Sequence, residues 1–452
     1  MSASLLHAWS RTVAVAPAAR ALCDAASGRT WSRQELDTLA AAWRAAHGSD
    51  VAGQTVMFAE PNGPGWLEVF LGLLKSGAVI VALDPGEPPA AQRAIAAAIG
   101  AAWRWCDGRL ESLATRRRAA RDGRRLIKLT SGSTGMPRTL AFTDAQMLAD
   151  GRQICSAMRI RPGDLNLGLI PWGHSYGLGN LVMPLLIQGT ALLSGVAPLP
   201  HALAAATARW RPTIFPAVPA VLGALAESAV DRAQLASLRT IISAGAPLPA
   251  EVAVAFLKKF GHKIRGFYGS SETGGICYDA TGEATLAGRS VGPPLPAVRL
   301  HFRRGGRFSV ESPAVVTLGQ HRRDKRGHLM ADIGRLDERG ELVLLARTGR
   351  FVKIAGRRLN LAEVEQALRR LPGVRDAWVA VHPARPDALA AVVAGEGSAA
   401  ELTAGLRGRL ASWKLPRKWI LVPALPLTAR GKTDTRRLRE LVCGRPAPRG
   451  AE

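Results

Sequence analysis

The first part of the chain alternates between helix-like segments and short apolar segments of strand length, and this alternation limits the folds that it can adopt. Residues 40–46 have a helical composition, whereas residues 78–83 are typical of a buried strand and residues 126–129 of another short strand. Strands that alternate with helices form sheets whose faces the helices cover. The sequence therefore predicts α/β layers with a largely parallel sheet.

The later part of the chain has a different pattern. From about residue 288 to residue 345, short strands and turns predict a small β-rich section. A helix is expected after Asn360, with Glu363 completing a capping box and with Pro372 and Gly373 ending the helix. The remaining expected elements are strands over 376–381, 390–393 and 419–422 and a helix from about 399 to 412. Together they predict a small α+β domain.

At 452 residues the chain is too long for one compact domain. We expect an α/β protein with a large N-terminal domain of layered α/β subdomains plus the β-rich section over 1–347, the α+β domain over 348–445 and a flexible tail over 446–452. Its five cysteines are scattered and form no CxxC pair, which predicts reduced thiols. No apolar run has the length of a membrane span, and the first residues lack a signal-peptide pattern. We therefore expect a cytoplasmic protein.

A stretch rich in glycine and hydroxyl groups follows the expected strand over 126–129. It reads Thr130-Ser131-Gly132-Ser133-Thr134-Gly135-Met136-Pro137-Arg138. Glycines let a backbone approach an anion closely, and consecutive N–H groups form an anion-binding concavity. The hydroxyls add donors, and the Arg138 guanidinium matches phosphate oxygens. The stretch predicts a phosphate-binding loop, with a flexible surface turn as the alternative.

A second such stretch reads Tyr268-Gly269-Ser270-Ser271-Glu272-Thr273-Gly274-Gly275. Tyr268 offers a flat face for a nucleotide base, Ser271 a hydroxyl, and Glu272 a hard oxygen ligand for Mg²⁺. Near the end of the chain, Lys432 follows Gly431. Each feature alone is typical of an ordinary loop or a surface lysine, but together they predict a nucleotide-using enzyme.

These motifs, in this order along most of the chain, resemble the adenylate-forming (ANL) superfamily, in particular its acyl-CoA synthetases and AMP-dependent acid ligases. Further similar segments are Pro171-Trp172-Gly173-His174-Ser175-Tyr176-Gly177, Ser243-Ala244-Gly245-Ala246-Pro247-Leu248 and Lys353-Ile354-Ala355-Gly356. The resemblance implies that the C-terminal domain is mobile. It also implies ATP, Mg²⁺ and coenzyme A, or the phosphopantetheine of a carrier protein, as cofactors.

The resemblance assigns roles to individual residues. It implies catalytic roles for Lys432, Glu272 and Arg138, with Glu272 binding the metal. It implies that ATP or AMP is bound by Thr130, Ser131, Gly132, Ser133, Thr134, Gly135, Ala244, Gly245, Ala246, Tyr268, Gly269, Ser271, Asp332 and Arg347. Asp332 and Arg347 would bind the ribose. The implied acyl pocket contains His174, Tyr176, Gly245 and Gly274, and the implied thiol tunnel and hinge contain Arg350, Lys353 and Gly356.

The chain departs from the family pattern at several positions. Arg138 replaces the usual lysine at the end of the phosphate loop, which keeps the charge but changes its geometry. Gly266 replaces an amide side chain, Met330 and Ala331 precede Asp332, and Arg350 replaces the common hinge aspartate. The chain is also short between Trp103 and Thr130.

The expected activity is ATP-dependent conversion of a carboxylic acid to an acyl-AMP, followed by thioester formation with coenzyme A or with an acyl carrier protein. Apolar residues around His174 and over 215–219 favour an aliphatic or aromatic acid. The formal net charge of +25 suits these anionic partners. The basic clusters of the chain have no interleaved aromatic residues, so we expect no nucleic acid partner. We also expect no membrane span, because no apolar run is long enough.

Two other classes of function remain open in the sequence. Gly173-His174-Ser175-Tyr176-Gly177 satisfies the G-x-S-x-G pattern of serine hydrolases, with Ser175 as nucleophile and with His321, His328 or His382 available as base. A protein that binds nucleotide without chemistry is the second alternative, against which the combination of Glu272, Asp332, Arg347 and Lys432 argues.

Overall fold

The computed structural model describes residues 4–87, 89–113, 123–130, 138–319, 323–347, 351–354, 357–407, 409–410, 412–428 and 432–444. The chain divides into two units. The first comprises Met1–Arg303, Phe308–Met330 and Leu336–Val343, and the second Arg304–Arg307, Ala331–Arg335 and Leu344–Glu452. The expected domain boundary at residues 347–348 stays a prediction, as does the tail over 446–452, which lies outside the described residues.

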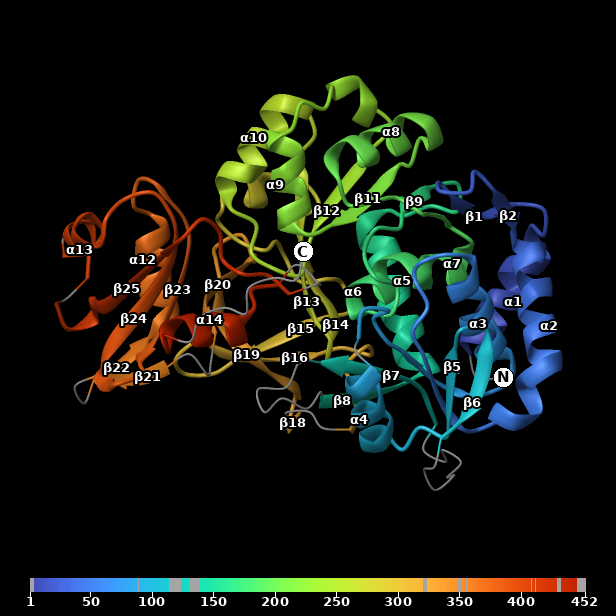
Figure 1. The fold of residues 1–452 in the computed structure, drawn as a ribbon. Helices are drawn as coiled ribbons and strands as arrows, with labels where there is room; N and C mark the ends of the chain where they lie inside the picture. Colours follow the sequence, from blue (N-terminus) through green and yellow to red (C-terminus); the bar gives the residue numbers. More distant parts are fainter. Residues whose placement is uncertain are drawn as a thin grey trace. The chain divides into compact units, whose positions relative to one another are not determined.

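The first unit contains an eight-stranded sheet with the order β14-β13-β12-β11-β9-β10-β1-β2 (Figure 1). Its strands are β1 (Arg20–Asp24), β2 (Thr30–Ser32), β9 (Leu165–Leu167), β10 (Ala191–Ser194), β11 (Ile214–Ala217), β12 (Thr240–Ser243), β13 (Ile264–Ser270) and β14 (Gly274–Tyr278). The strands from β13 to β1 are parallel to their neighbours, and the edge strands β2 and β14 are antiparallel. One face is covered by α8 (Pro200–Trp210), α9 (Pro219–Glu227) and α10 (Ala250–Phe260), which bury Leu203, Leu222 and Phe256 against it.

A seven-stranded sheet with the order β17-β8-β7-β4-β3-β5-β6 completes the layers. Its strands are β3 (Thr55–Phe58), β4 (Val79–Ala82), β5 (Trp103–Cys106), β6 (Arg109–Ser112), β7 (Arg124–Thr130), β8 (Arg138–Thr143) and β17 (Leu318–Gly319). Helix α4 (Pro89–Ile99) packs Ile95 on Val79, Val81 and Ile127. Helix α5 (Asp144–Met158), which begins with a capping box of Thr143 and Gln146, contacts β7 and β8 of this sheet and β14 of the other.

Other helices of the first unit are α1 (Leu5–Val15), α2 (Arg33–Val51), α3 (Pro64–Lys75), α6 (Ser175–Gly177), the π-helical turn η1 (Leu178–Val182), α7 (Met183–Gln188), the 3₁₀ turn η2 (Arg232–Leu235) and α11 (Glu283–Leu286). The predicted α/β layers are confirmed, and so are the helix at residues 40–46 and the strands at 78–83 and 126–129. The sheets are parallel in their centres and antiparallel at their edges, because β7 and β8 form a hairpin across the glycine-rich loop, as β13 and β14 do across theirs.

The predicted β-rich section is confirmed. It contains β15 (Arg299–Phe302), β16 (Arg307–Glu311), β18 (Arg323–Asp324), β19 (Gly327–Leu336) and β20 (Leu342–Arg347). These strands form a small sheet with the order β15-β16-β19-β18, in which β20 also pairs with β19.

The second unit is built on the three-stranded sheet β23-β24-β25, with β23 (Val374–His382), β24 (Arg385–Gly395) and β25 (Pro416–Val422). Helices α12 (Leu361–Arg369) and α13 (Ala399–Arg407) pack on one face, and α14 (Thr435–Val442) buries Leu438 and Val442 against the other. A hairpin of β21 (Phe351–Ile354) and β22 (Arg357–Asn360) precedes α12.

Two details of the second unit differ from the sequence-based expectation. Helix α13 ends at Arg407 rather than near residue 412, and a short 3₁₀ turn, η3 (Ser412–Lys414), follows. Helix α14 was not predicted, because only Leu438 and Val442 mark its buried face among many arginines.

Within the described parts of the chain, every helix is too short or too polar to cross a membrane.

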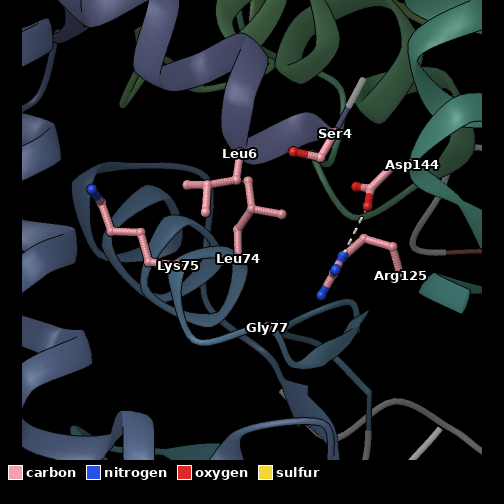
Figure 2. Close-up of a pocket in the computed structure, with 7 residues that line it drawn as sticks. All are labelled: Ser4, Leu6, Leu74, Lys75, Gly77, Arg125 and Asp144. Atoms are coloured by element: carbon pink, nitrogen blue, oxygen red, sulfur yellow. Dashed lines mark hydrogen bonds and ion pairs between the residues drawn. The ribbon is translucent and has the colours of Figure 1, made fainter. Parts of the chain in front are cut away.

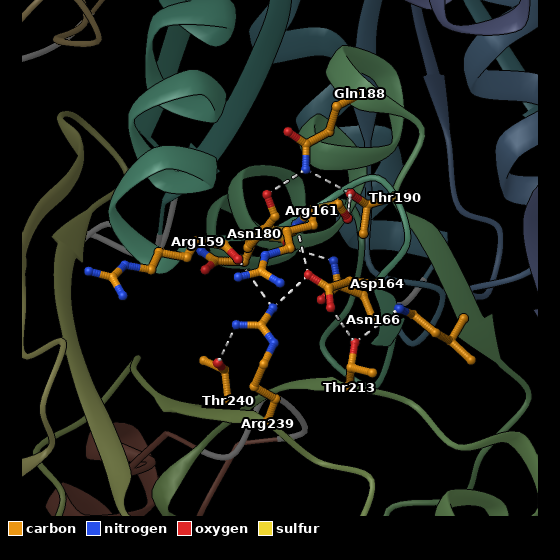
Figure 3. A network of polar contacts seen from close by, with 12 residues as sticks. Arg159, Arg161, Asp164, Asn166, Asn180, Gln188, Thr190, Thr213, Arg239 and Thr240 are labelled. Carbon is orange, nitrogen blue, oxygen red and sulfur yellow. Dashed lines mark hydrogen bonds and ion pairs between the residues drawn. The ribbon is translucent and has the colours of Figure 1, made fainter. Parts of the chain in front are cut away.

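The strands β9, β11 and β12 are tied together where they begin (Figure 3). The Asp164 carboxylate, 6% exposed, accepts hydrogen bonds from Arg161 N at 2.7 Å, Thr213 Oγ1 at 2.7 Å and Arg239 Nη2 at 2.6 Å. Thr213 Oγ1 in turn accepts from Leu165 N at 3.2 Å. One buried carboxylate thus joins the residues that lead into three neighbouring strands, at the edge opposite their carboxyl ends.

This network predicts a loss of stability in Asp164→Asn. The amide lacks the charge that balances Arg239, and its NH₂ group faces donors, so the free energy of unfolding should fall by about 2–3 kcal/mol. Urea denaturation followed by circular dichroism measures the change. Glu111→Gln, which removes the charge of the exposed Arg104–Glu111 pair, should change it by less than about 1 kcal/mol. Equal midpoints for the two variants would contradict the role given to Asp164.

Candidate active site

The carboxyl ends of β11, β12 and β13 meet at one edge of the eight-stranded sheet. Ala217 is paired with Ser243, and Ser243 with Gly266, while Ala244 N donates to Ala217 O at 3.2 Å. The chain then turns at Gly245, whose φ of +89° favours glycine. Parallel sheets bind ligands outside the carboxyl ends of their strands. The structure therefore places the predicted residues Ala244, Gly245 and Ala246 at a suitable edge, with Gly245 and Ala246 exposed.

Strand β13 continues past this edge and forms a hairpin with β14. Tyr268 is paired with Cys277, Gly269 with Gly275, and Ser270 with Gly274. Tyr268 and Gly269 are therefore strand residues, and the expected loop is limited to Ser271, Glu272 and Thr273, which we call the hairpin tip. The two strands approach too closely for a side chain at Gly269, since its Cβ would lie 2.6 Å from Gly274 O.

The hairpin tip is held on several sides. Ser175 Oγ donates to Ser271 Oγ at 2.9 Å, and the carbonyl of Glu272 accepts from Val316 N at 2.8 Å. Thr273 is fully buried, and its hydroxyl lies 3.0 Å from Ser270 Oγ. The Glu272 side chain is half-buried. The backbone of Glu272 is thus held by a hydrogen bond, while its side chain is not fully buried.

The segment around α6 reaches the same edge. Tyr176 Oη donates to Ala217 O at 3.4 Å and Ile242 O at 3.3 Å, and its ring centroid lies 6.2 Å from that of Phe267. Burial raises the pKa of the Tyr176 hydroxyl well above its ordinary value, so it remains a neutral donor. His174 Nδ1 accepts from Tyr176 N at 3.2 Å, which places the proton of the neutral ring on Nε2. His174 and Tyr176 are therefore fixed beside the hairpin tip.

The Asn62 side chain binds the backbone of the segment that leads to His174. The sequence did not predict this role. Asn62 Nδ2 donates to Gly168 O at 2.9 Å and Ile170 O at 2.8 Å, and Asn62 Oδ1 accepts from Trp172 N at 2.9 Å. The amide thus satisfies three backbone groups more than 100 positions away in sequence. Only the fold reveals the partners of Asn62.

The predicted phosphate loop connects β7 to β8. Thr130 and Arg138 are backbone partners at the loop end of this hairpin, and residues 131–137 lie outside the described residues, as do the side chains of Thr130 and Arg138. The roles given to this stretch stay predictions. The strand that enters it carries Lys128, which is buried, and α5 carries a buried carboxylate, Asp150. Neither was predicted, although a lysine within an apolar strand was a visible signal.

The residues expected to bind ribose lie on paired strands, Asp332 on β19 and Arg347 at the end of β20. Of the predicted tunnel and hinge, Lys353 lies on β21 opposite Arg358, while Arg350 and Gly356 lie outside the described residues. Lys432 is exposed, its carbonyl accepts from Thr428 N at 2.7 Å, and its N–H donates to Thr428 Oγ1 at 3.3 Å. These roles also stay predictions.

The geometry does not favour Ser175 as a hydrolase nucleophile. A nucleophile elbow places the serine on a sharp turn directly between a strand and a helix. Here β9 ends at Leu167, well before Ser175, which begins the three-residue helix α6. Its hydroxyl donates to Ser271, and the ring of His174 accepts from a backbone N–H.

Among the described residues, no three His, Cys, Asp or Glu side chains gather as a metal site. Magnesium is commonly held by one or two carboxylates together with substrate phosphates and water. A single carboxylate at the half-buried Glu272, next to the hydroxyl of Ser271, fits a metal that arrives with a nucleotide.

A cavity of about 130 Å³ lies elsewhere in the first unit (Figure 2). It is lined by Ser4, Leu6, Leu74, Lys75, Gly77, Arg125 and Asp144. Its cations are already paired, Arg125 with Asp144 at 3.3 Å and Lys75 with Asp37 at 2.7 Å. A strand rises about 3.3 Å per residue, so Arg125 lies roughly 16 Å from Thr130. This cavity is therefore separate from the candidate site.

Two protein-family models match this chain. The family model described as AMP-binding enzyme matches residues 114–303, and the model of the AMP-binding enzyme C-terminal domain matches residues 363–432. Together the two matches span more than half of the chain. The hairpin tip, the α6 segment and the carboxyl edge of the large sheet all fall in the first match.

Individual relatives agree with these matches. The chain is 28% identical over 429 residues to a feruloyl-CoA synthase of an Amycolatopsis species, covering 84% of this chain and 87% of the relative. It is 26% identical to a long-chain-fatty-acid–CoA ligase of Bacillus subtilis, but the match spans 70% of this chain and only 61% of that relative. The fold is similar to ATP-bound MatB from Rhodopseudomonas palustris, with a TM-score of 0.81 at 24% identity over 96% of this chain and 98% of MatB. The predicted fold class is thereby confirmed.

The contacts of Asn62 predict a local effect in Asn62→Asp. The carboxylate loses both donors and faces the carbonyls of Gly168 and Ile170, at a cost of about 1 kcal/mol for each hydrogen bond. Amide hydrogen exchange in residues 168–178, followed by mass spectrometry, should accelerate about 30-fold. Gln34→Ala, on the exposed face of α2, serves as control. Unchanged exchange in this peptide, or an equal rise throughout the first unit, would count against the role of Asn62.

Proposed function

Since the chain belongs to the adenylate-forming superfamily, we propose that it activates a carboxylic acid with ATP and then transfers the acyl group to a thiol. In the first step, a carboxylate oxygen attacks the α-phosphorus of ATP. The bond from this phosphorus to the bridging oxygen breaks, and pyrophosphate leaves with the electron pair. The product is an acyl-AMP. Such a reaction depends mainly on positioning and on neutralisation of negative charge.

The observation that carries this proposal is the arrangement at the carboxyl edge of the eight-stranded sheet. There the hairpin tip with Glu272 is bonded to Ser175, and Tyr176 is anchored under the ends of β11 and β12. The tip offers the half-buried Glu272 and the Ser271 hydroxyl, and the turn at Gly245 offers exposed backbone. This supports a nucleotide site beside an acid pocket.

In the proposal, Glu272 holds Mg²⁺, which would neutralise the phosphate oxygens. The loop from Thr130 to Arg138 binds the departing phosphates through its N–H groups, its hydroxyls and the Arg138 guanidinium. Tyr268, Gly269 and Ser271 flank the base and phosphate, with Ala244 to Ala246 on the adenine side. Asp332 accepts hydrogen bonds from the ribose hydroxyls, and Arg347 assists. Lys432 donates to the carboxylate and α-phosphate oxygens, where charge develops.

The acid in this proposal is aliphatic or aromatic. Leu178, Leu181 and Val182 follow Tyr176 and are buried, as are Phe215 and Ala217 on β11. Gly245 and Gly274 join His174 and Tyr176 in the proposed lining of this pocket. An apolar pocket of this kind favours an acid whose body is apolar, and relatives named for long-chain fatty and ferulic acids support this class.

In the second proposed step, a thiol attacks the acyl carbon, the thioester forms and AMP leaves with the electron pair, while the thiol proton passes to solvent. The acceptor is coenzyme A, and the alternative acceptor is the phosphopantetheine of an acyl carrier protein. Lys353 and Gly356 line the path of the thiol, and Arg350 is the pivot on which the C-terminal domain changes position. Closure over the anhydride would exclude water.

A product screen by mass spectrometry tests the proposed function. The purified protein is incubated with ATP, Mg²⁺ and a pool of aliphatic and aromatic acids, with and without coenzyme A. Formation of an acyl-CoA supports the proposal and identifies the acid. Acyl-AMP that persists despite coenzyme A favours a carrier protein as acceptor. No product from any acid would favour a protein that binds nucleotide without turning it over.

Lys432→Ala should lose acyl-AMP formation. Removing one preorganised donor from a transition state lowers the rate by about 10²–10³-fold. Trapping of acyl-AMP with hydroxylamine measures this step. Arg436→Ala, which removes an exposed cation of the same unit, should retain near-normal activity. Adenylate formation at the normal rate in Lys432→Ala would defeat the assignment.

Arg350→Pro should separate the two steps. Proline restricts the backbone of residue 350 and of the residue before it, which impedes rotation at the proposed pivot. Acyl-AMP formation should remain near normal, while thioester formation from preformed acyl-AMP and coenzyme A should be lost. If both steps fall equally, the pivot does not lie at Arg350.

A further inference from the structure

The strands that lead to the two predicted nucleotide loops belong to different sheets, yet buried charges lie between them. Lys128 on β7, two positions before Thr130, is 3% exposed, and Asp150 on α5 is also 3% exposed. Helix α5 contacts both β7 and β14. A buried charge is costly unless an opposite charge lies near it, so this pair requires a physical explanation.

Lys128 lies on the face of β7 opposite Ile127, because side chains alternate along a strand. Ile127 packs in the core under α4, whereas the Lys128 ammonium lies 4.2 Å from the centroid of the Phe142 ring. Burial lowers the pKa of Lys128, and the carboxylates of Asp150 and Glu272 oppose this shift. Both carboxylates therefore act on the same ammonium, and one of them belongs to the hairpin tip.

Asp150 attaches the hairpin to α5. Its Oδ1 accepts from Gly275 N at 2.9 Å, and the neighbouring Gln153 Nε2 donates to Gly275 O at 3.2 Å. Both backbone groups of Gly275 are thus bound by one helix. Gly274 leaves the space that the carboxylate occupies, since a Cβ there would lie 2.2 Å from Asp150 Oδ1, and its φ of +68° also favours glycine.

We propose that Lys128 and Asp150 are positioning residues that hold Glu272 at a fixed place relative to the end of β7, the strand that enters the phosphate loop. The proposal rests on the proposed function, in which Glu272 binds Mg²⁺ of the nucleotide. Asp150 fixes the start of β14 through Gly275. Lys128, which lies on the strand β7, attracts the carboxylates of Asp150 and Glu272. Buried charges with a purely structural role could be replaced by neutral residues without loss of metal affinity, whereas positioning residues could not.

The test compares Lys128→Met, Asp150→Asn and the double variant. Each single variant removes one buried charge and leaves the opposite buried charge less well compensated, so its melting temperature should fall. The double variant removes both charges, while the amide oxygen introduced at position 150 can still accept from Gly275 N. Its melting temperature should therefore recover to within about 3 °C of the wild type.

Isothermal titration calorimetry then measures ATP binding with Mg²⁺ and, separately, with EDTA. Loss of outer-shell support commonly lowers metal affinity 10–100-fold. The double variant should bind ATP with Mg²⁺ about tenfold more weakly than the wild type, with unchanged binding in EDTA. Asp164→Asn is the matched control, because it neutralises a buried carboxylate at the opposite edge of the sheet. It should lower the melting temperature and leave the effect of Mg²⁺ unchanged.

The outcomes separate this inference from the proposed function. A folded double variant with wild-type Mg²⁺-dependent affinity would overturn the positioning role, while acid activation by the wild type would still support the function. Weaker Mg²⁺-dependent binding in the double variant would support positioning even if no acid in the screen is activated. A wild type whose ATP binding does not respond to Mg²⁺ would overturn the inference.

Discussion

The attachment of the β13–β14 hairpin to α5 is the constraint on which the candidate site depends. An antiparallel pair at the edge of a sheet is free to twist unless other elements hold it. Here Asp150 and Gln153 bind both backbone groups of Gly275, and Val316 binds the carbonyl of Glu272. The hairpin is consequently tied to the helix that supports it. The Ser175–Ser271 hydrogen bond also ties its tip to the α6 segment.

The two edges of the large sheet have different roles in this account. One edge carries a hydrogen-bond network that stabilises the sheet, and the other carries the candidate site. At the edge where β9, β11 and β12 begin, the buried Asp164 carboxylate joins Arg161, Thr213 and Arg239 through hydrogen bonds. At the opposite edge, short connections such as the turn at Gly245 leave backbone exposed beside the hairpin. A parallel arrangement makes this possible, since it places all carboxyl ends on the same side.

The sequence predicted features that depend on neighbours along the chain. Residues 78–83 are continuously apolar and form β4, and the helix after Asn360 has its start and stop signals within a few residues. The identity of the hairpin tip as a candidate metal and phosphate site also followed from a local motif. The strand conformation of Tyr268 and Gly269 was missed, because it requires pairing with Cys277 and Gly275, which glycine-rich composition does not indicate.

Contacts between distant segments could not be predicted from the sequence. Asn62 binds Gly168, Ile170 and Trp172, and Asp150 binds Gly275, across more than 100 positions in each case. Lys128 was visible as a charge in an apolar strand, but its relation to Asp150 and Glu272 depends on the packing of α5 between two sheets. Such residues have no local signature, because their partners are assembled only by the fold.

An isotope-transfer experiment tests the central claim, that this site joins a carboxylate to the α-phosphorus of ATP. An acid accepted by the enzyme is labelled with ¹⁸O in both carboxylate oxygens and converted to its thioester, and the nucleotide product is analysed by mass spectrometry. Attack at the α-phosphorus predicts AMP that carries one ¹⁸O atom and is heavier by two mass units. Unlabelled AMP, or label found in inorganic phosphate together with ADP, would contradict the account.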